Sequence, residues 1–172
     1  ASWPRLRCKL TLHRRLPRAH RGLTQALACR TRFRQKAMRI SASVHNSTEH
    51  FAIVETDGIE RVVAIPAKES GRGSSVNGGE LLMLALATCY CNDLFREATR
   101  LGIEISEVRV AASADFLGVG LAAENIRYSV AVLSSSPSAD IDSLIAATDQ
   151  VAEIHNTIRS AIPVTLEHVA AG

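Results

Sequence analysis

The residues of this chain best suited to chemistry are its cysteines, because a thiolate can attack an electrophile or bind a metal ion. Cys8 and Cys29 lie in a basic N-terminal segment, whereas Cys89 and Cys91 lie two positions apart in one apolar stretch. These spacings form neither a disulfide framework nor a zinc-binding pattern. We therefore expect no bound metal and no cofactor, and any chemistry should be that of a free thiol.

Cys89 is expected deep inside a helix, about three turns from its start, where the helix dipole no longer lowers a thiol pKa. A buried thiol without help keeps a raised pKa and stays inert. Asn92 and Asp93 follow at i+3 and i+4 and can lie beside the sulfur. Alternatively both are ordinary helix residues and Cys89 is a small core residue. Cys91 points to nearly the opposite side of the helix and is interpreted as core.

The helix that carries Cys89 has clear start and stop signals and should run from about Gly78 to Arg100. Asn77, with Glu80 three residues later, resembles a capping box, and Gly102 is a natural C-terminal stop. Residues 81–91 are apolar on every face, which predicts burial all round. The domain's own sheet cannot supply all of that cover, so a further element, such as a partner subunit, is expected.

Strand patterns precede and follow this helix. Asp57-Gly58 predicts a turn between two of the strands, and Pro137-Ser138 opens a second helix. The full set comprises strands at 39–45, 50–55 and 61–66, the long helix, strands at 108–116 and 126–132, the helix after Pro137, a short helix at 153–160 and a last strand at 162–166. The order β-β-β-α-β-β-α-α-β predicts an α+β domain.

Charge divides the chain into two unlike parts. Residues 1–37 contain eleven Lys or Arg and no acid, whereas residues 38–172 carry nine bases and all 17 acids, a net charge of −8. We interpret 38–172 as one domain and 1–37 as a disordered extension. The extension is either an upstream stretch outside the working protein, which we prefer, or an Arg-rich organellar presequence, or a basic arm for nucleic acid or a membrane surface.

The charge and the hydropathy of the domain each argue against one class of partner. Nucleic-acid binding depends on neutralising phosphates, which a net negative domain opposes. No apolar run approaches the roughly 20 residues needed to cross a bilayer. We expect neither a nucleic-acid nor a membrane partner, and a reducing cytoplasmic location, or an organelle if residues 1–37 are a presequence.

Two segments resemble the OsmC/Ohr family of thiol proteins. The stretch 76–110 (VNGGELLMLALATCYCNDLFREATRLGIEISEVRV) is similar to the family's central helix and following strand, with Glu80-Leu81-Leu82 leading to Cys89 at the reactive position. The tail 156–167 (NTIRSAIPVTLE) resembles the family's closing segment. The strand and helix order agrees from Met38 to about Val169, so the domain is identified as a member of this family.

This resemblance implies an OsmC-like fold, with two antiparallel sheets around a long buried central helix in an intertwined homodimer. It also implies reduction of organic hydroperoxides in oxidative-stress defence. In that reaction a Cys thiolate attacks the O–O bond, and a second Cys condenses the resulting sulfenic acid into a disulfide.

Three positions depart from the family's peroxidases. Ala152 stands where the second Cys is expected, and Gly79 stands where the peroxidases have a Glu. Their active-site Arg comes from the N-terminal sheet region, where this chain offers Arg61 or Arg72. Arg72 lies in the Gly/Ser-rich loop at 69–79, which can either bring its guanidinium to the site or leave it in solvent.

Family geometry would also bring the segment around the missing second Cys close to Cys89. Glu153 and His155 then become candidate neighbours of the sulfur. A Cys-His pair oriented by an Asn or Asp is a known way to generate a nucleophilic thiolate. Alternatively His155 only caps a short helix.

Three functions follow from this site. The first is a one-cysteine peroxidase that uses Cys89 and an external thiol reductant. The second is a Cys/His hydrolase-like enzyme on the same scaffold. The third is a non-catalytic dimer whose apolar cleft binds a small ligand.

Overall fold

The computed structural model describes residues 37–47 and 49–167 of the 172. The basic segment 1–36, with Cys8 and Cys29, lies outside the described residues, so the expectations for it stay predictions. The elements are β1 (Ile40–Asn46), β2 (His50–Thr56), β3 (Ile59–Val63), α1 (Gly78–Leu101), β4 (Glu107–Asp115), β5 (Glu124–Leu133), α2 (Ser138–Val151) and α3 (Glu153–Arg159). The chain is thus α+β, with two antiparallel sheets and one long helix.

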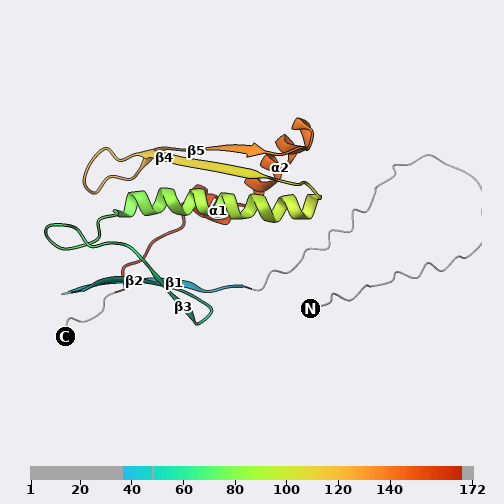
Figure 1. Cartoon of the computed structure of the whole chain (residues 1–172). Coiled ribbons are helices and arrows are strands. Elements are labelled where there is room, and N and C mark those ends of the chain that lie inside the picture. The colour runs from blue at the N-terminus through green and yellow to red at the C-terminus, as the bar shows by residue number, and fades with distance from the viewer. Residues whose placement is uncertain (1–36, 48, 168–172) are drawn as a thin grey trace, which may run out of the picture. The chain divides into compact units, whose positions relative to one another are not determined.

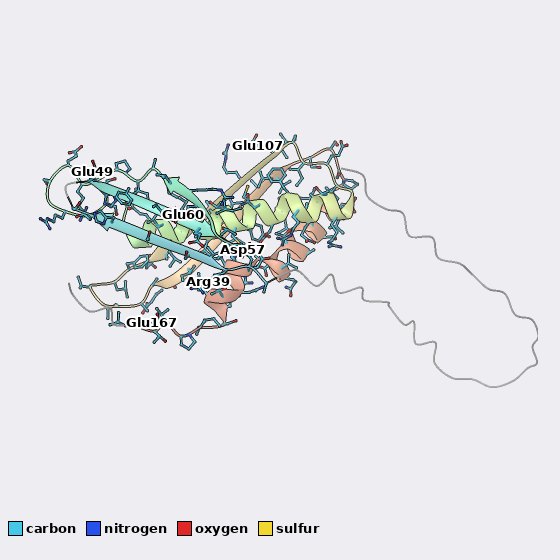
Figure 2. The ribbon with its side chains drawn as sticks, turned by 90° about the horizontal axis from the view of Figure 1, so that it is seen from below. Arg39, Glu49, Asp57, Glu60, Glu107 and Glu167 are labelled. Carbon is cyan, nitrogen blue, oxygen red and sulfur yellow. The ribbon has the colours of Figure 1, made fainter. Side chains whose placement is uncertain are left out.

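The first sheet is a meander in which β2 pairs with both β1 and β3. The predicted turn at Asp57-Gly58 is confirmed, and both residues have positive φ, 49° and 85°, as a two-residue hairpin turn requires. This turn pairs Thr56 with Ile59, so β3 begins two residues earlier than the expected 61–66. The backbone N–H of Arg39 donates to the Asp57 carboxylate at 3.0 Å, and Figure 2 shows the two residues together at this end of the sheet.

Helix α1 begins and ends where the sequence predicts. The Asn77 side chain accepts from the Glu80 backbone N–H at 3.0 Å, and the Glu80 carboxylate accepts from the Asn77 N–H at 2.7 Å, which completes the capping box. Gly102, with φ 73°, ends the helix in the left-handed conformation. The single chain does not bury every face of α1, because the Leu84 side chain is 59% exposed, and the expected cover by a further element stays a prediction.

The core lies between α1, the β4–β5 hairpin and α2. Tyr90, Leu94 and Ala98 recur every four residues on α1 and pack with Leu144 of α2 and with Ala152. The inward-facing residues of β4 and β5 complete this cluster, and Figure 1 shows α1 running along the hairpin with α2 beside it. No helix among the described residues has the length and apolarity that a membrane span requires.

The last expected strand, at 162–166, does not form. Residues 162–167 have no regular structure, and the side chains of Val164 and Leu166 are 100% and 92% exposed. The strand pattern alone cannot create a strand, because the backbone also needs a free sheet edge to pair with. Among the described residues no edge of either sheet takes this segment up.

Candidate functional site

Cys89 lies at the contact between α1 and α3, among two carboxylates and one backbone amide. Its Sγ donates to Asp93 Oδ2 at 3.4 Å and lies 3.9 Å from Glu153 Oε2. The Ile154 backbone N–H lies near enough to the sulfur to lower its pKa. Asp93 follows one turn after Cys89 on α1, as the i+4 spacing predicts, whereas Glu153 and Ile154 come from the first turn of α3.

The short break between α2 and α3 brings Glu153 to the thiol. Ala152 has an extended backbone (φ −70°, ψ 100°) that ends α2 and starts α3 in a new direction. Its side chain is fully buried in the core cluster. Because this joint is packed against α1, the residues that follow it are held beside Cys89.

The surroundings of Cys89 keep its thiol protonated. Burial raises the pKa of Cys89, and the Ile154 N–H lowers it in part. The hydrogen bond to Asp93 and the negative charges of Asp93 and Glu153 raise it further. The thiol hydrogen is therefore directed at carboxylate oxygens, which can accept the proton when the sulfur attacks a substrate.

Asp93 is the more buried of the two carboxylates. Burial raises the pKa of Asp93, while the hydrogen bond from Cys89 and the charge of Arg96 lower it in part. Such a carboxyl group can pass between its ionised and protonated forms more easily than an exposed Asp near neutral pH. This property suits a group that takes up a proton and returns it.

Arg96 supplies the cation of the site, and sequence reasoning missed it. Its guanidinium lies 2.8 Å from Asp93 Oδ1 and 3.6 Å from Glu153 Oε1, and so bridges the two carboxylates. The family resemblance pointed to Arg61 or Arg72, whereas Arg96 is seven residues after Cys89 and three after Asp93. That spacing puts all three on one helix face and could have revealed it.

The ligand atoms of Cys89, Asp93 and Glu153 lie within 4.8 Å of one another, close enough to share a metal ion. Arg96 already places a positive charge against both carboxylates. A metal ion would have to displace this guanidinium.

The other predicted site residues lie apart from the thiol. Arg72 is exposed in the loop before α1. Asn92 is exposed and lines, with Cys91, a separate cavity of about 360 Å³ between α1 and β4. Among the described residues neither has a hydrogen bond to Cys89, and their roles stay predictions.

His155 lies in the core, and its ring packs edge-on against two tyrosines. Its centroid is 5.4 Å from that of Tyr90 and 4.5 Å from that of Tyr128. Both ring nitrogens are buried and have no hydrogen-bond partner among the described residues. The predicted Cys-His pair therefore has no hydrogen bond that supports it, and the role of His155 in activating the thiol stays a prediction.

A second polar network flanks His155 and joins α2, α3 and β5. Arg159 lies 2.7 Å from Asp149 Oδ1, and the Tyr128 hydroxyl donates to the same carboxylate. The hydrogen bonds from Arg159 and then Tyr128 hold the pKa of Asp149 below its usual value. The Asp149 carboxylate thus already accepts hydrogen bonds from two donors, Arg159 and Tyr128.

Residues 71–167 match the family model described as OsmC-like protein. The chain belongs to the OsmC-like protein family. The match covers α1, the β4–β5 hairpin, α2 and α3, and therefore every residue of the Cys89 cluster. The family membership predicted from the segment that includes Glu80 and Cys89 is confirmed.

Solved structures of OsmC-like proteins have a related fold. One is an OsmC-like protein from Mycoplasma pneumoniae, with a TM-score of 0.52 and 18% identity, covering 73% of this chain and 89% of that one. Another is an organic hydroperoxide resistance protein from Legionella pneumophila, with a TM-score of 0.44 and 21% identity, covering 70% and 89%. An OsmC-like hydroperoxide resistance protein from Jannaschia has a TM-score of 0.46 and 14% identity, covering 80% and 96%. No curated protein sequence matches the chain.

Gly79 is the position at which the family resemblance leads us to expect a Glu in the peroxidases. A Cβ built on Gly79 would lie 2.9 Å from the Phe116 ring and 3.1 Å from the capping oxygen of Asn77. Any side chain here must displace the ring and press on the helix cap. The aromatic ring of Phe116 thus takes the space in which a Glu side chain would begin.

Proposed function

We propose that this OsmC-like chain reduces organic hydroperoxides through Cys89 in a one-cysteine cycle. The observation that carries the proposal is the Cys89–Asp93 hydrogen bond of 3.4 Å, which joins the thiol at the family's reactive position to a buried proton acceptor. Among the described residues the only other cysteine is Cys91, which lines a cavity between α1 and β4. In the proposed cycle an external thiol reduces the oxidised Cys89, which places the activity in a reducing compartment such as the cytoplasm.

The first half of the cycle needs one proton acceptor and later one proton donor. Asp93 takes the proton of the Cys89 thiol as Sγ attacks the distal oxygen of the hydroperoxide. The O–O bond breaks, Sγ becomes a sulfenic acid, and the leaving alkoxide takes the proton back from Asp93 as an alcohol. Sulfur gives up two electrons and the peroxide gains them.

The second half regenerates the thiol. An external dithiol attacks the sulfenic sulfur, releases water and leaves as a disulfide, which restores Cys89. Ala152 cannot perform this step because it has no sulfur. Arg96 keeps the Asp93 carboxylate in place between turnovers through their 2.8 Å ion pair.

Oxidation of Cys89 tests the proposal directly. We expect sub-stoichiometric cumene hydroperoxide to produce a dimedone-trapped sulfenic acid at Cys89, observed by mass spectrometry. With a dithiol present, Cys89→Ser should abolish hydroperoxide consumption, whereas the matched control Cys91→Ser should retain it. Undiminished consumption by Cys89→Ser, or equal oxidation of all cysteines, would refute the one-cysteine cycle.

One observation favours a second candidate, the non-catalytic dimer that binds a small apolar ligand. Burial and two carboxylates raise the pKa of Cys89. A raised pKa is also what an unreactive, protonated thiol would have. Under this alternative neither peroxide nor an electrophilic ester would modify Cys89 faster than Cys91. The Cys/His hydrolase requires a contact between the His155 ring and the Cys89 sulfur, and no hydrogen bond among the described residues joins the two.

We further propose that the chain forms a homodimer. The α1 face that the single chain leaves open includes Leu84, and the first sheet leaves Val44 and Val62 63% and 75% exposed. Exposed apolar area of this kind indicates an interface. A second copy is the occupant that the family resemblance implies.

The dimer is tested by size-exclusion chromatography with light scattering. Leu84→Arg should shift the chain from dimer to monomer, because a guanidinium would enter an apolar contact. Val119→Arg, at a fully exposed position between β4 and β5, is the matched control and should leave the mass unchanged. A wild-type chain that stays monomeric at micromolar concentration would contradict the proposal.

A further inference from the structure

His155 is the one residue of α3 whose side chain is buried in the core. Its neighbours on α3 are the groups that meet the thiol, since Ile154 precedes it directly and Glu153 comes two residues earlier. The position of α3 against α1 therefore depends on this ring. When His155 is in its aromatic contact, the Glu153 carboxylate and the Ile154 N–H lie at Cys89.

The pocket of His155 suits a neutral ring and not a charged one. Its two buried nitrogens have no partner among the described residues, and the ring makes edge-on contacts to Tyr90 from α1 and Tyr128 from β5. Such T-shaped contacts are favourable for a neutral aromatic ring. A cation buried without a partner is costly, and the surrounding structure must then open to admit water.

The charged groups near His155 offer little compensation. Asp149 on α2 is the nearby carboxylate, but Arg159 and the Tyr128 hydroxyl already bond it. Arg159, on α3 itself, repels an imidazolium, and burial together with this charge lowers the pKa of His155, which Asp149 only partly opposes. A protonated ring can reach water at the lowest free-energy cost if α3, a helix of only seven residues, detaches from the core.

We propose that His155 is a positioning residue that couples pH to the reactivity of Cys89. In its neutral form it docks α3 and holds Glu153 and the Ile154 N–H at the sulfur. Its protonation in mild acid releases α3 and removes both groups from the thiol. This inference rests on the proposed function only in taking Cys89 as the reacting thiol.

The direction of the pH effect follows from the lowered pKa. Because folding favours neutral His155, docking is fully stable above the unfolded pKa of about 6.5 and weakens as the pH falls below it. At about pH 5.5, one pH unit below the unfolded pKa, the opening of α3 should exceed that at pH 7.5, by up to roughly tenfold, which is the limit set by the unfolded pKa. The site should thus loosen in acid while the rest of the domain stays folded.

The test compares wild type with His155→Phe, which keeps the aromatic contacts and cannot be protonated. Hydrogen exchange read by mass spectrometry should show protection of 154–159 falling in wild type between pH 7.5 and 5.5, by up to about tenfold beyond the intrinsic change, and staying constant in the variant. Alkylation of Cys89 by iodoacetamide should show an acid inflection in wild type alone, with rates at pH 7.5 equal within about twofold. His45→Gln, on the exposed strand β1, is the control and should behave as wild type.

Two results would overturn the proposal. One is an acid inflection and loss of protection in His155→Phe equal to those of wild type. The other is full protection of 154–159 in wild type at pH 5.5, a measurement that needs no variant to fold. Neither readout involves peroxide, so a failure here is separate from failure of the one-cysteine cycle, which the sulfenic acid test decides.

Discussion

Asp93→Asn should slow hydroperoxide reduction by about 10²-fold or more, the usual contribution of a positioned acid–base group. The amide cannot take the proton that Cys89 donates to Oδ2, nor return one to the alkoxide. Its size matches that of the carboxyl group, so the packing around this buried position is kept. Stopped-flow consumption of cumene hydroperoxide, with dithiol in excess, measures the effect.

The same substitution should lower the thiol pKa although it also slows the reaction. Asp93 raises the pKa of Cys89 through its hydrogen bond and its charge, so an Asn there should lower it. More thiolate with slower turnover is the signature of a lost proton relay. A faster reaction in Asp93→Asn would show instead that Asp93 only suppresses the thiol and would refute its catalytic role.

Glu97→Gln is the matched control for this experiment. Glu97 is also a buried carboxylate on α1, four residues beyond Asp93, and it pairs with Arg100 at 2.6 Å. It also lies 3.7 Å from Arg96 Nε, a longer contact than the 2.8 Å ion pair that holds Arg96 to Asp93. It has no hydrogen bond to Cys89 among the described contacts. We expect its removal to cost stability and to leave both the thiol pKa and turnover per folded molecule close to wild type.

Leu144→Ala should lower the free energy of unfolding by about 2–5 kcal/mol, the range for truncating a fully buried leucine. Leu144 of α2 has no exposed surface and packs with Tyr90 and Leu94 of α1 and with Ala152. Removing three carbons leaves a cavity between the two helices, and a loss of this size is a large part of the 5–15 kcal/mol of a typical domain.

Urea unfolding at a fixed protein concentration measures this loss, because dimerisation makes apparent stability depend on concentration. Leu133→Ala, at the 61% exposed end of β5, is the matched control and should change the free energy by about 0.5 kcal/mol or less. Because Ala152 belongs to the same cluster, Leu144→Ala should also loosen the joint that carries Glu153 to the thiol. Equal stability of the two variants would show that the α1–α2 contact is not the centre of the core.

The sequence by itself determined the features that depend on neighbours along the chain. The capping box at Asn77, the stop at Gly102 and the turn at Asp57-Gly58 each follow from local backbone requirements, and all three form as predicted. The i+4 spacing placed Asp93 beside Cys89 for the same reason. The segments 76–110 and 156–167, with the order of strands and helices, also identified the family.

Only the tertiary structure decided the features that depend on which surfaces meet. The packing of α3 against α1 brings Glu153 to Cys89 from 64 residues away and buries His155 in the core instead of at the sulfur. It also brings the Arg96 guanidinium to the Cys89 cluster, where it lies near Asp93 of α1 and Glu153 of α3. The strand expected at 162–166 fails for the converse reason, since pairing needs an edge that no local pattern can supply.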